Sequence, residues 1–186
     1  MVKAALLDRD NTLILDKGYT YRTDELIWMP GAIKGISLLS SLGFKLIVIT
    51  NQSGIAMGYY DEQQMSIFHE FMNDNLYERA NLKFDGFYYC PHHPDAKLKE
   101  FRKVCQCRKP GDSLYKKAFA DFSLDPKLSF VIGDRLTDLI PAFNNGIRKG
   151  FLLYSDRSVE SSSYNGESKL VKVNNWEEII DNLPYL

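Results

Sequence analysis

The segment KAALLDRDNT, residues 3–12, joins a short apolar run to two aspartates that are separated by one residue. We predict that the run at 3–8 is a strand. Four later segments have a similar character: KLIVIT (45–50), FDGFYYC (84–90), LSFVIGD (128–134) and KGFLLY (149–154). Several of the five are apolar throughout rather than alternating, as expected of strands buried on both faces of a parallel sheet. The segment 3–12 therefore predicts a buried strand followed directly by acidic side chains.

Longer amphipathic segments lie between these strands. The segment 30–43 begins with proline and ends at glycine, the usual boundaries of a helix. The segment 61–81 repeats apolar side chains at helical spacing. Further helices are predicted at 113–122, 136–146 and 175–183, and Pro141 is expected to kink the second of these or to shift its start. The polar stretch 155–168 is expected to be a surface loop. Strands and helices in alternation predict an open, doubly wound α/β sheet.

The bulk composition indicates an ordinary single domain spanning residues 1–186. Lys and Arg total 23 and Asp and Glu total 24, a formal charge of -1, so neither a nucleic-acid nor a membrane-surface partner is indicated. The first apolar run is too short for a secretion signal, and no stretch reaches the roughly 20 apolar residues of a membrane helix. Three cysteines do not make a disulfide framework. We therefore expect a cytoplasmic protein, and a monomer.

Polar residues collect where the predicted strands end. Asp8 and Asp10 follow the first strand, Thr50 ends the second, and Asp134 and Asp138 follow the fourth. Any single one of them could be a helix cap or a turn residue. Because sites in doubly wound sheets form beyond the carboxyl ends of the strands, the whole set together favours a functional site.

Phosphoryl transfer through an aspartyl-phosphate would use this set of residues. Asp8 can attack phosphorus, and Asp10 can protonate the leaving oxygen and later activate water. Oxygen ligands from Asp8, Asp10 and Asp134 suit Mg²⁺, which would offset the repulsion between these carboxylates and a phosphate dianion. Thr50 and Lys109, the latter just ahead of a predicted helix, can hold the non-bridging oxygens.

The stretch CPHHPDAKLKEFRKVCQCRKP, residues 90–110, holds all three cysteines and two of the three histidines. Two closely spaced pairs provide four soft ligands, the number and type that closed zinc sites use. The candidate ligands are Cys90, His92, Cys105 and Cys107. Buried thiols, a disulfide or a catalytic cysteine are the alternatives. We predict a structural zinc site, with His93 as a non-ligand or an occasional substitute.

Four motifs resemble those of the haloacid dehalogenase (HAD) superfamily of phosphohydrolases: LLDRDNT, ITNQSG, RKP and VIGDRLTD. The segment CPHHP…CQCRKP resembles the zinc loop of the heptose 1,7-bisphosphate phosphatases within that superfamily, and histidinol-phosphate phosphatases carry a similar loop. The resemblance runs from about Val2 to Tyr154. It implies a Rossmann-like three-layer α/β fold with a mainly parallel central sheet, a Mg²⁺-dependent phosphatase activity, a structural zinc and no large cap domain.

The same resemblance implies roles for individual residues. Asp8 is implied as the nucleophile and Asp10 as the general acid and base, which also gives Mg²⁺ a backbone carbonyl. Asp134 completes the Mg²⁺ site, and Asp138 supports it. The implied substrate contacts are Asp16, Lys17, Gly18, Tyr19, Thr50, Asn51, Gln52, Ser53, Arg108, Lys109 and Arg135.

Three positions depart from the family pattern. Asn11 stands where glycine is usual, Lys17 where histidine is usual, and Met57 where a basic residue is common. Asparagine tolerates left-handed backbone angles better than most residues, so the turn at Asn11 is expected to survive. His69, in the middle of a predicted helix beside core positions, is expected to be structural.

The resemblance makes removal of the 7-phosphate from D-glycero-D-manno-heptose 1,7-bisphosphate, in lipopolysaccharide precursor synthesis, the leading hypothesis. A histidinol-phosphate phosphatase, or a phosphatase of another small phosphate ester, is the alternative among enzymes. Arg108 and Arg135 favour an anionic substrate over a cationic amine. A zinc-stabilised binding module without activity is the alternative from a different class. The balanced charge argues against a nucleic-acid 3′-phosphatase.

Overall fold

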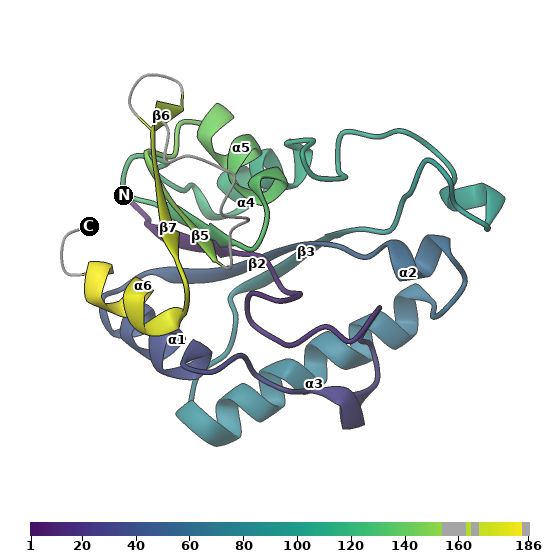
Figure 1. The fold of residues 1–186 in the computed structure, drawn as a ribbon, viewed down its shortest axis with the longest axis horizontal. Helices are drawn as coiled ribbons and strands as arrows, with labels where there is room; N and C mark the ends of the chain where they lie inside the picture. Colours follow the sequence, from purple (N-terminus) through teal and green to yellow (C-terminus); the bar gives the residue numbers. More distant parts are fainter. Residues whose placement is uncertain (154–162, 165–167, 184–186) are drawn as a thin grey trace.

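The computed structural model describes residues 1–153, 163–164 and 168–183. A seven-stranded sheet in the order β3-β2-β1-β4-β5-β7-β6 lies at the centre of the fold (Figure 1). All neighbouring strands are parallel except β6 and β7, which pair antiparallel at one edge. The strands are β1 (Ala4–Leu7), β2 (Lys45–Asn51), β3 (Gly86–Cys90), β4 (Phe130–Gly133), β5 (Lys149–Leu153), β6 (Ser163–Tyr164) and β7 (Ser168–Val173).

Helices cover both faces of the sheet, as Figure 1 shows. Helices α1, α3 and α6 lie on one face, and α4 and α5 lie on the other. The α-helices are α1 (Ala32–Ser41), α2 (Ser53–Ala56), α3 (Glu62–Ala80), α4 (Ser113–Phe122), α5 (Leu136–Asn144) and α6 (Trp176–Asn182), and two 3-10 helices span Thr23–Glu25 and Lys99–Phe101. The arrangement confirms the predicted doubly wound, three-layer α/β fold.

Strand β1 shows why the sequence folds in this way. All four of its side chains are buried. Ala5 and Leu7 belong to the core under α1, α3 and α6, whereas Ala4 and Leu6 belong to the core under α4 and α5. Successive side chains of a strand point to opposite faces, so an unbroken apolar run is what a strand covered on both faces requires.

The sheet extends further than the sequence indicated. Five strands were predicted, and all five form within two residues of the predicted bounds. Strand β7, which pairs with β5, was missed. The expectation of a loop at 155–168 is wrong for residues 163–164 and 168, which lie in β6 and β7, and the rest of that stretch lies outside the described residues. Lys169 and Lys172 interrupt the apolar pattern of β7, so the sequence alone does not indicate a strand there. A strand near the sheet edge can keep polar side chains because one of its faces need not be buried.

Pro141 neither ends helix α5 nor delays its start. The helix runs unbroken from Leu136 to Asn144 with Pro141 inside it. The proline is buried against the sheet in the position where its missing N–H removes one hydrogen bond of the helix. Packing of the apolar side of α5 therefore outweighs the local cost. Among the described residues, no helix is long and apolar enough to cross a membrane.

Candidate active site

A cavity of about 330 Å³ opens beyond the carboxyl ends of β1, β2 and β4. Strand β1 lies between β2 and β4, so the chain connections diverge at this point and leave a crevice. The cavity is lined by Asp8, Asp10, Asn11, Asp16, Gly18, Tyr19, Thr50, Asn51, Gln52, Ser53, Tyr60, His93, Arg108, Lys109, Asp134, Arg135, Thr137 and Asp138. The structure thus brings together the predicted catalytic residues and the predicted substrate residues, apart from the exposed Lys17.

The Lys109 ammonium pairs with two carboxylates, Asp8 after strand β1 and Asp138 in the first turn of helix α5. Its Nζ lies 2.6 Å from Asp8 Oδ1 and 2.7 Å from Asp138 Oδ1, and it donates to the Ile49 carbonyl at 2.8 Å. Burial opposes a charge on this amine, but the carboxylates of Asp138 and Asp8 raise the pKa of Lys109 above its ordinary value. Lys109 is therefore a buried ammonium beside the Asp8 carboxylate.

Three carboxylates gather around this ammonium. Oxygen atoms of Asp8, Asp134 and Asp138 lie within 4.8 Å of one another. Burial raises the pKa of Asp8 well above its ordinary value, and repulsion from the neighbouring carboxylates acts in the same direction against Lys109. Burial and the Asp138 carboxylate raise the pKa of Asp134 to about 6. The Lys109 ammonium and the exposed Arg135, whose Nε lies 3.7 Å from Asp134 Oδ2, do not neutralise three carboxylates, and hard oxygen ligands in a partly polar cavity fit a cation such as Mg²⁺.

Asp138 is less available to a metal than its two neighbours. It is buried, and its Oδ2 accepts a hydrogen bond from the Arg135 backbone N at 3.0 Å while Oδ1 faces Lys109. These contacts fit the supporting role that the sequence suggested for Asp138. Asp8 and Asp134 are the side chains whose oxygens are left to face a cation.

The Asp10 carboxylate lies outside this cluster and is held by donors of its own. Arg9 Nε lies 2.8 Å from Asp10 Oδ1, and Arg9 Nη2 lies 3.1 Å from Oδ2. Gln52 Nε2 donates to Asp10 Oδ2 at 3.0 Å and to Thr50 Oγ1 at 2.8 Å. The side chain of Asp10 is thus oriented by hydrogen bonds, and its contribution to a metal would be the backbone carbonyl.

Arg9, Tyr60 and His69 are parts of the site that the sequence reasoning missed or set aside. Arg9 is completely buried beneath Asp10. Tyr60 donates to Gln52 Oε1 at 2.6 Å and fixes the direction of that amide. An arginine between two aspartates carries no signal of burial by itself, because arginine is rarely buried unless it is paired.

The turn after β1 has the left-handed backbone conformation expected at Asn11. Asn11 adopts a left-handed backbone with φ of 58°. Its Oδ1 accepts from the Asp16 N at 3.1 Å. Asp16 Oδ1 in turn accepts from Gly18 N, Thr20 N and Thr20 Oγ1 at 3.1, 2.9 and 3.0 Å. Asp16 therefore shapes the wall of the cavity.

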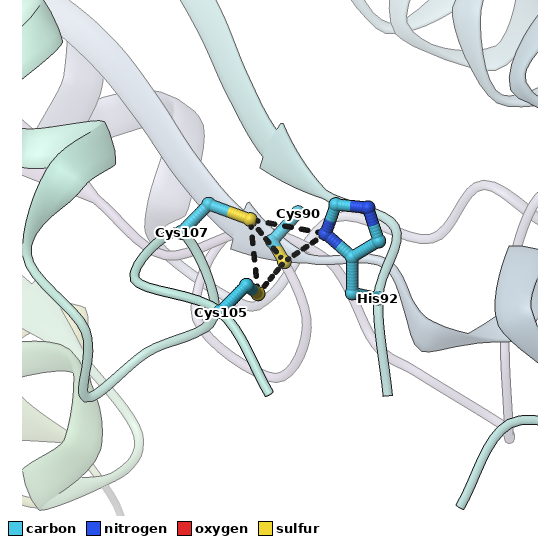
Figure 2. Close-up of side chains that lie close together, drawn as sticks. All are labelled: Cys90, His92, Cys105 and Cys107. Carbon is cyan, nitrogen blue, oxygen red and sulfur yellow. Dashed lines mark hydrogen bonds between the residues drawn. The ribbon is translucent and has the colours of Figure 1, made fainter. Parts of the chain in front are cut away.

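The zinc ligands that the sequence predicted converge in the structure (Figure 2). Cys90 ends strand β3, and Cys105 and Cys107 return to it from the loop that follows. The separations are 3.6 Å for Cys90 Sγ to Cys105 Sγ, 3.2 Å for Cys105 Sγ to Cys107 Sγ, and 3.2 Å for His92 Nδ1 to Cys107 Sγ. Cys107 Sγ also lies 2.7 Å from Cys90 Sγ. Zn–S bonds of about 2.3 Å would hold tetrahedral sulfur ligands about 3.8 Å apart, so these sulfur atoms lie closer together than around a bound ion, and the donor set fits a closed zinc site by its number and kind of ligands.

All three cysteines, which lie in the described part of the chain, are free thiols. Burial raises the pKa of Cys90. The disulfide alternative is thus not what the structure shows. His93, next to His92, accepts from the Asp95 N through its Nδ1 at 3.1 Å and lines the cavity instead.

The cysteine loop leads directly into the cavity. Arg108 Nη1 donates to the His92 carbonyl at 3.2 Å. The backbone of Lys109 is bound on both sides by the Asn51 amide, with Lys109 N to Asn51 Oδ1 at 3.0 Å and Asn51 Nδ2 to Lys109 O at 3.3 Å. Asn51 is thereby occupied with holding the loop, and Lys109 is fixed between the loop and strand β2.

Comparisons with known proteins agree with this geometry. The HAD-hydrolase-like family profile matches residues 106–165. A D-glycero-beta-D-manno-heptose-1,7-bisphosphate 7-phosphatase of Haemophilus ducreyi is 37% identical over 184 residues, covering 99% of this chain and 98% of the relative. The enzyme of the same name from Escherichia coli K12 is 37% identical over 164 residues, covering 88% of this chain and 85% of the relative.

A solved structure is similar over nearly the whole length. The crystal structure of the D,D-heptose 1,7-bisphosphate phosphatase of B. bronchiseptica, complexed with magnesium and phosphate, has a TM-score of 0.81 and 25% identity. The similarity covers 99% of each chain. The magnesium belongs to that relative, and the carboxylates described above offer the same kind of ligand.

Proposed function

Because this chain belongs to the HAD-like hydrolases, and within them to the D-glycero-beta-D-manno-heptose-1,7-bisphosphate 7-phosphatases, we propose that it removes the 7-phosphate of D-glycero-D-manno-heptose 1,7-bisphosphate. It is a phosphatase. The observation that carries the proposal is the pairing of Asp8 with the buried Lys109 ammonium at 2.6 Å. The pair lies in a cavity that the carboxylates of Asp10 and Asp134 also line.

Asp8 serves as the nucleophile in this proposal. One of its oxygens forms a bond to phosphorus while the bond from phosphorus to the sugar oxygen breaks, and the sugar oxygen takes the proton of Asp10. Asp10 then accepts a proton from water, whose oxygen bonds to phosphorus as the aspartyl-phosphate bond breaks. Both steps balance, and the products are the dephosphorylated sugar and inorganic phosphate.

Lys109 and Thr50 bind the non-bridging oxygens of the phosphoryl group. The Lys109 ammonium is held in place by Asp138 and the Ile49 carbonyl, and the N–H that now faces Asp8 would turn to a phosphoryl oxygen when the substrate binds. The Thr50 hydroxyl is oriented by Gln52. Mg²⁺, held by Asp8, Asp134 and the Asp10 carbonyl, would neutralise negative charge at the reacting phosphate when it is bound.

The rim of the cavity favours a substrate with a second anionic group. Arg108 and Arg135 both line it. The Arg135 side chain is 75% exposed, with its Nε 3.7 Å from Asp134 Oδ2. The connections 11–31 and 91–112 contain only short 3-10 helices and isolated bridges, and neither is long enough in helix or strand to be a cap domain. A bulky sugar bisphosphate can therefore enter with its distal phosphate facing the two arginines, whereas the cationic amine of histidinol phosphate would be repelled.

A turnover comparison tests the substrate. The purified protein is given the α and β anomers of the heptose 1,7-bisphosphate, histidinol phosphate and a panel of other sugar phosphates, each with and without Mg²⁺. We expect Mg²⁺-dependent phosphate release with the highest kcat/KM for a heptose bisphosphate anomer. A higher kcat/KM for histidinol phosphate would contradict the proposed substrate, and the absence of phosphate release from every ester would contradict an enzymatic role.

Asp8→Asn tests the covalent route. Asparagine fills the same space, but its amide is not a nucleophile, so turnover should fall to background while the thermal unfolding midpoint changes little. Lys109 keeps Asp138 and the Ile49 carbonyl as partners in this variant, so the fold should persist. Substantial residual hydrolysis would falsify the aspartyl-phosphate mechanism. Mass spectrometry of wild-type protein quenched during turnover should also find phosphate on Asp8.

We further propose that Cys90, His92, Cys105 and Cys107 bind a structural zinc ion. The donor set supports this, since three thiols and one imidazole nitrogen face a common centre. The zinc would hold the loop that carries Arg108 and Lys109 into the cavity and would take no part in the reaction.

A further inference from the structure

We propose that Arg9 is the positioning residue for proton transfer by Asp10, an inference that rests on the proposed phosphatase function. The Arg9 side chain is completely buried, while 24% of the Asp10 side chain is exposed to the cavity. The guanidinium binds both oxygens of the carboxylate, through Nε at 2.8 Å and Nη2 at 3.1 Å. A two-point contact of this kind fixes the plane of a carboxylate as well as its position.

Burial of Arg9 has a cost that the fold alone does not explain. A buried cation is unfavourable unless it is paired and fully hydrogen-bonded, and an apolar side chain of similar volume is often at least as stabilising. Every nitrogen of the guanidinium nevertheless has a partner: Nη2 also donates to the Thr20 carbonyl at 2.8 Å, and Nη1 lies 3.2 Å from His69 Nε2. The surroundings are built to hold this guanidinium beneath Asp10.

His69 supplies an acceptor and no charge. Burial, with the nearby Arg9 cation, holds the pKa of His69 well below 6.5, so the ring is neutral. Its Nε2 faces a group that can only donate, which places the ring proton on Nδ1. The imidazole stacks on Phe87 with ring centroids 4.4 Å apart, and the guanidinium lies 5.2 Å from the centre of the Phe68 ring. Helix α3 and strand β3 therefore fix the guanidinium.

Gln52 completes the hold on Asp10 from the other side. Its Nε2 donates to Asp10 Oδ2 at 3.0 Å, and its Oε1 is turned away by the hydrogen bond from Tyr60 at 2.6 Å. The two oxygens of Asp10 thus accept three hydrogen bonds, two from Arg9 and one from Gln52. The exposed part of the Asp10 side chain faces the cavity. An aspartate held in this way can deliver a proton to a leaving oxygen in only a narrow range of positions, which is what general acid catalysis needs.

The leaving group distinguishes a positioning role from a general loss of structure. A sugar alkoxide needs a proton as it leaves, whereas p-nitrophenolate does not. The kinetic parameter kcat/KM reports the steps up to loss of the leaving group, and it does not include the later attack of water. Misplacing the acid should therefore lower kcat/KM for a sugar phosphate and leave kcat/KM for p-nitrophenyl phosphate nearly unchanged.

The experiment compares Arg9→Met and Arg9→Lys with the wild-type protein at saturating Mg²⁺, using the heptose bisphosphate and p-nitrophenyl phosphate. For Arg9→Met we expect kcat/KM to fall roughly 100-fold with the sugar phosphate, within the range of general acid catalysis, and by less than about threefold with p-nitrophenyl phosphate. Arg9→Lys keeps the charge without the two-point contact, so its losses should fall between those of the wild type and Arg9→Met. Should Arg9→Met fail to fold, Arg9→Lys carries the same comparison.

Arg22→Met is the matched control. Arg22 makes the same two-point contact with Asp24, at 3.0 and 2.9 Å, but its side chain is 59% exposed and lies outside the cavity. It should change neither kcat/KM. Equal losses with both substrates in the Arg9 variants, or no loss with either, would overturn the role of Arg9 while leaving the phosphatase intact. Failure of the wild-type protein to hydrolyse any sugar phosphate would overturn the function and this inference together.

Discussion

At the scale of single residues, the cavity is organised by charges that come from distant parts of the sequence. Asp8 and Lys109 are far apart in the chain, yet their side chains meet at 2.6 Å. The sequence predicted both residues because each stands beside a strand or loop end that the topology brings to one edge of the sheet. It did not predict Arg9 or the use of Asn51 to hold Lys109, because these contacts depend on which side chains are buried.

His69 makes a prediction about stability at acid pH. Its folded-state pKa is held well below 6.5 by burial and by Arg9. The unfolded chain therefore binds a proton at this site near and below pH 6.5 that the folded chain does not bind. Stability from the neutral ring is fully present above pH 6.5 and is lost as the pH falls, by up to about 1.4 kcal/mol per pH unit.

His69→Gln tests this prediction. Glutamine does not titrate and still offers an oxygen to Arg9, so the free energy of unfolding of the variant should fall less steeply between pH 6.5 and pH 5 than that of the wild type. Urea unfolding at a series of pH values measures the difference. Parallel curves for the two proteins would show that folding does not lower the pKa of His69.

At the scale of elements, the loop between β3 and α4 connects a metal site to the catalytic cavity. Its first half carries Cys90 and His92, and its second half ends in Arg108 and Lys109. The sequence predicted the four ligands from their spacing, and the structure brings their ligand atoms within 4.8 Å of one another. The loop has little helix or strand of its own, so a metal would supply the order that hydrogen bonds alone do not.

Removal of zinc should loosen this loop. We expect that Cys107→Ser, or chelation, lowers the zinc content and the unfolding midpoint, and also lowers kcat/KM at saturating Mg²⁺ because Arg108 and Lys109 lose their fixed position. Metal analysis, thermal unfolding and kinetics on the same samples measure the three effects. His93→Gln is the control for zinc content, since His93 Nδ1 is bound to the Asp95 N and not to the cluster. Full activity of a zinc-free protein would make the loop a scaffold without influence on the site.

At the scale of the whole molecule, the C-terminal helix α6 closes the core next to the catalytic turn. Trp176 is buried between α1 and the sheet, and its Nε1 donates to the Thr12 carbonyl at 2.8 Å. A Cβ placed at Gly35 in helix α1 would lie 2.3 Å from the Trp176 ring, so the two helices fit only because this residue is glycine. Thr12 is in turn hydrogen-bonded to Asp8, at 3.4 Å. The last helix therefore supports the first motif.

Trp176→Phe should affect both stability and catalysis. Loss of the indole N–H leaves the buried Thr12 carbonyl without that partner, at a cost of about 1–3 kcal/mol, and frees the turn that carries Asp8. We expect a lower free energy of unfolding together with a lower kcat/KM. Trp28→Phe is the matched control, because the Trp28 indole also makes one hydrogen bond, to Asn75 Oδ1 at 2.8 Å, away from the cavity. It should lower stability alone, and an equal kinetic loss in both variants would contradict the link from α6 to Asp8.

The sequence by itself determined the alternation of strands and helices, the strand ends that carry Asp8, Thr50 and Asp134, and the spacing of the four candidate zinc ligands. These are local properties, since hydrophobic runs, turn residues and short spacings are set by neighbours along the chain. The departure from expectation at strand β7 occurs where packing outweighed local preference. Only the tertiary structure decided that Arg9 is buried under Asp10, that Asn51 holds Lys109, and that Trp176 supports Thr12. Arg9 is enclosed by His69 of helix α3, and the other two contacts likewise join segments whose proximity follows from the complete fold. Burial is what gives a charge or a hydrogen bond its energetic weight.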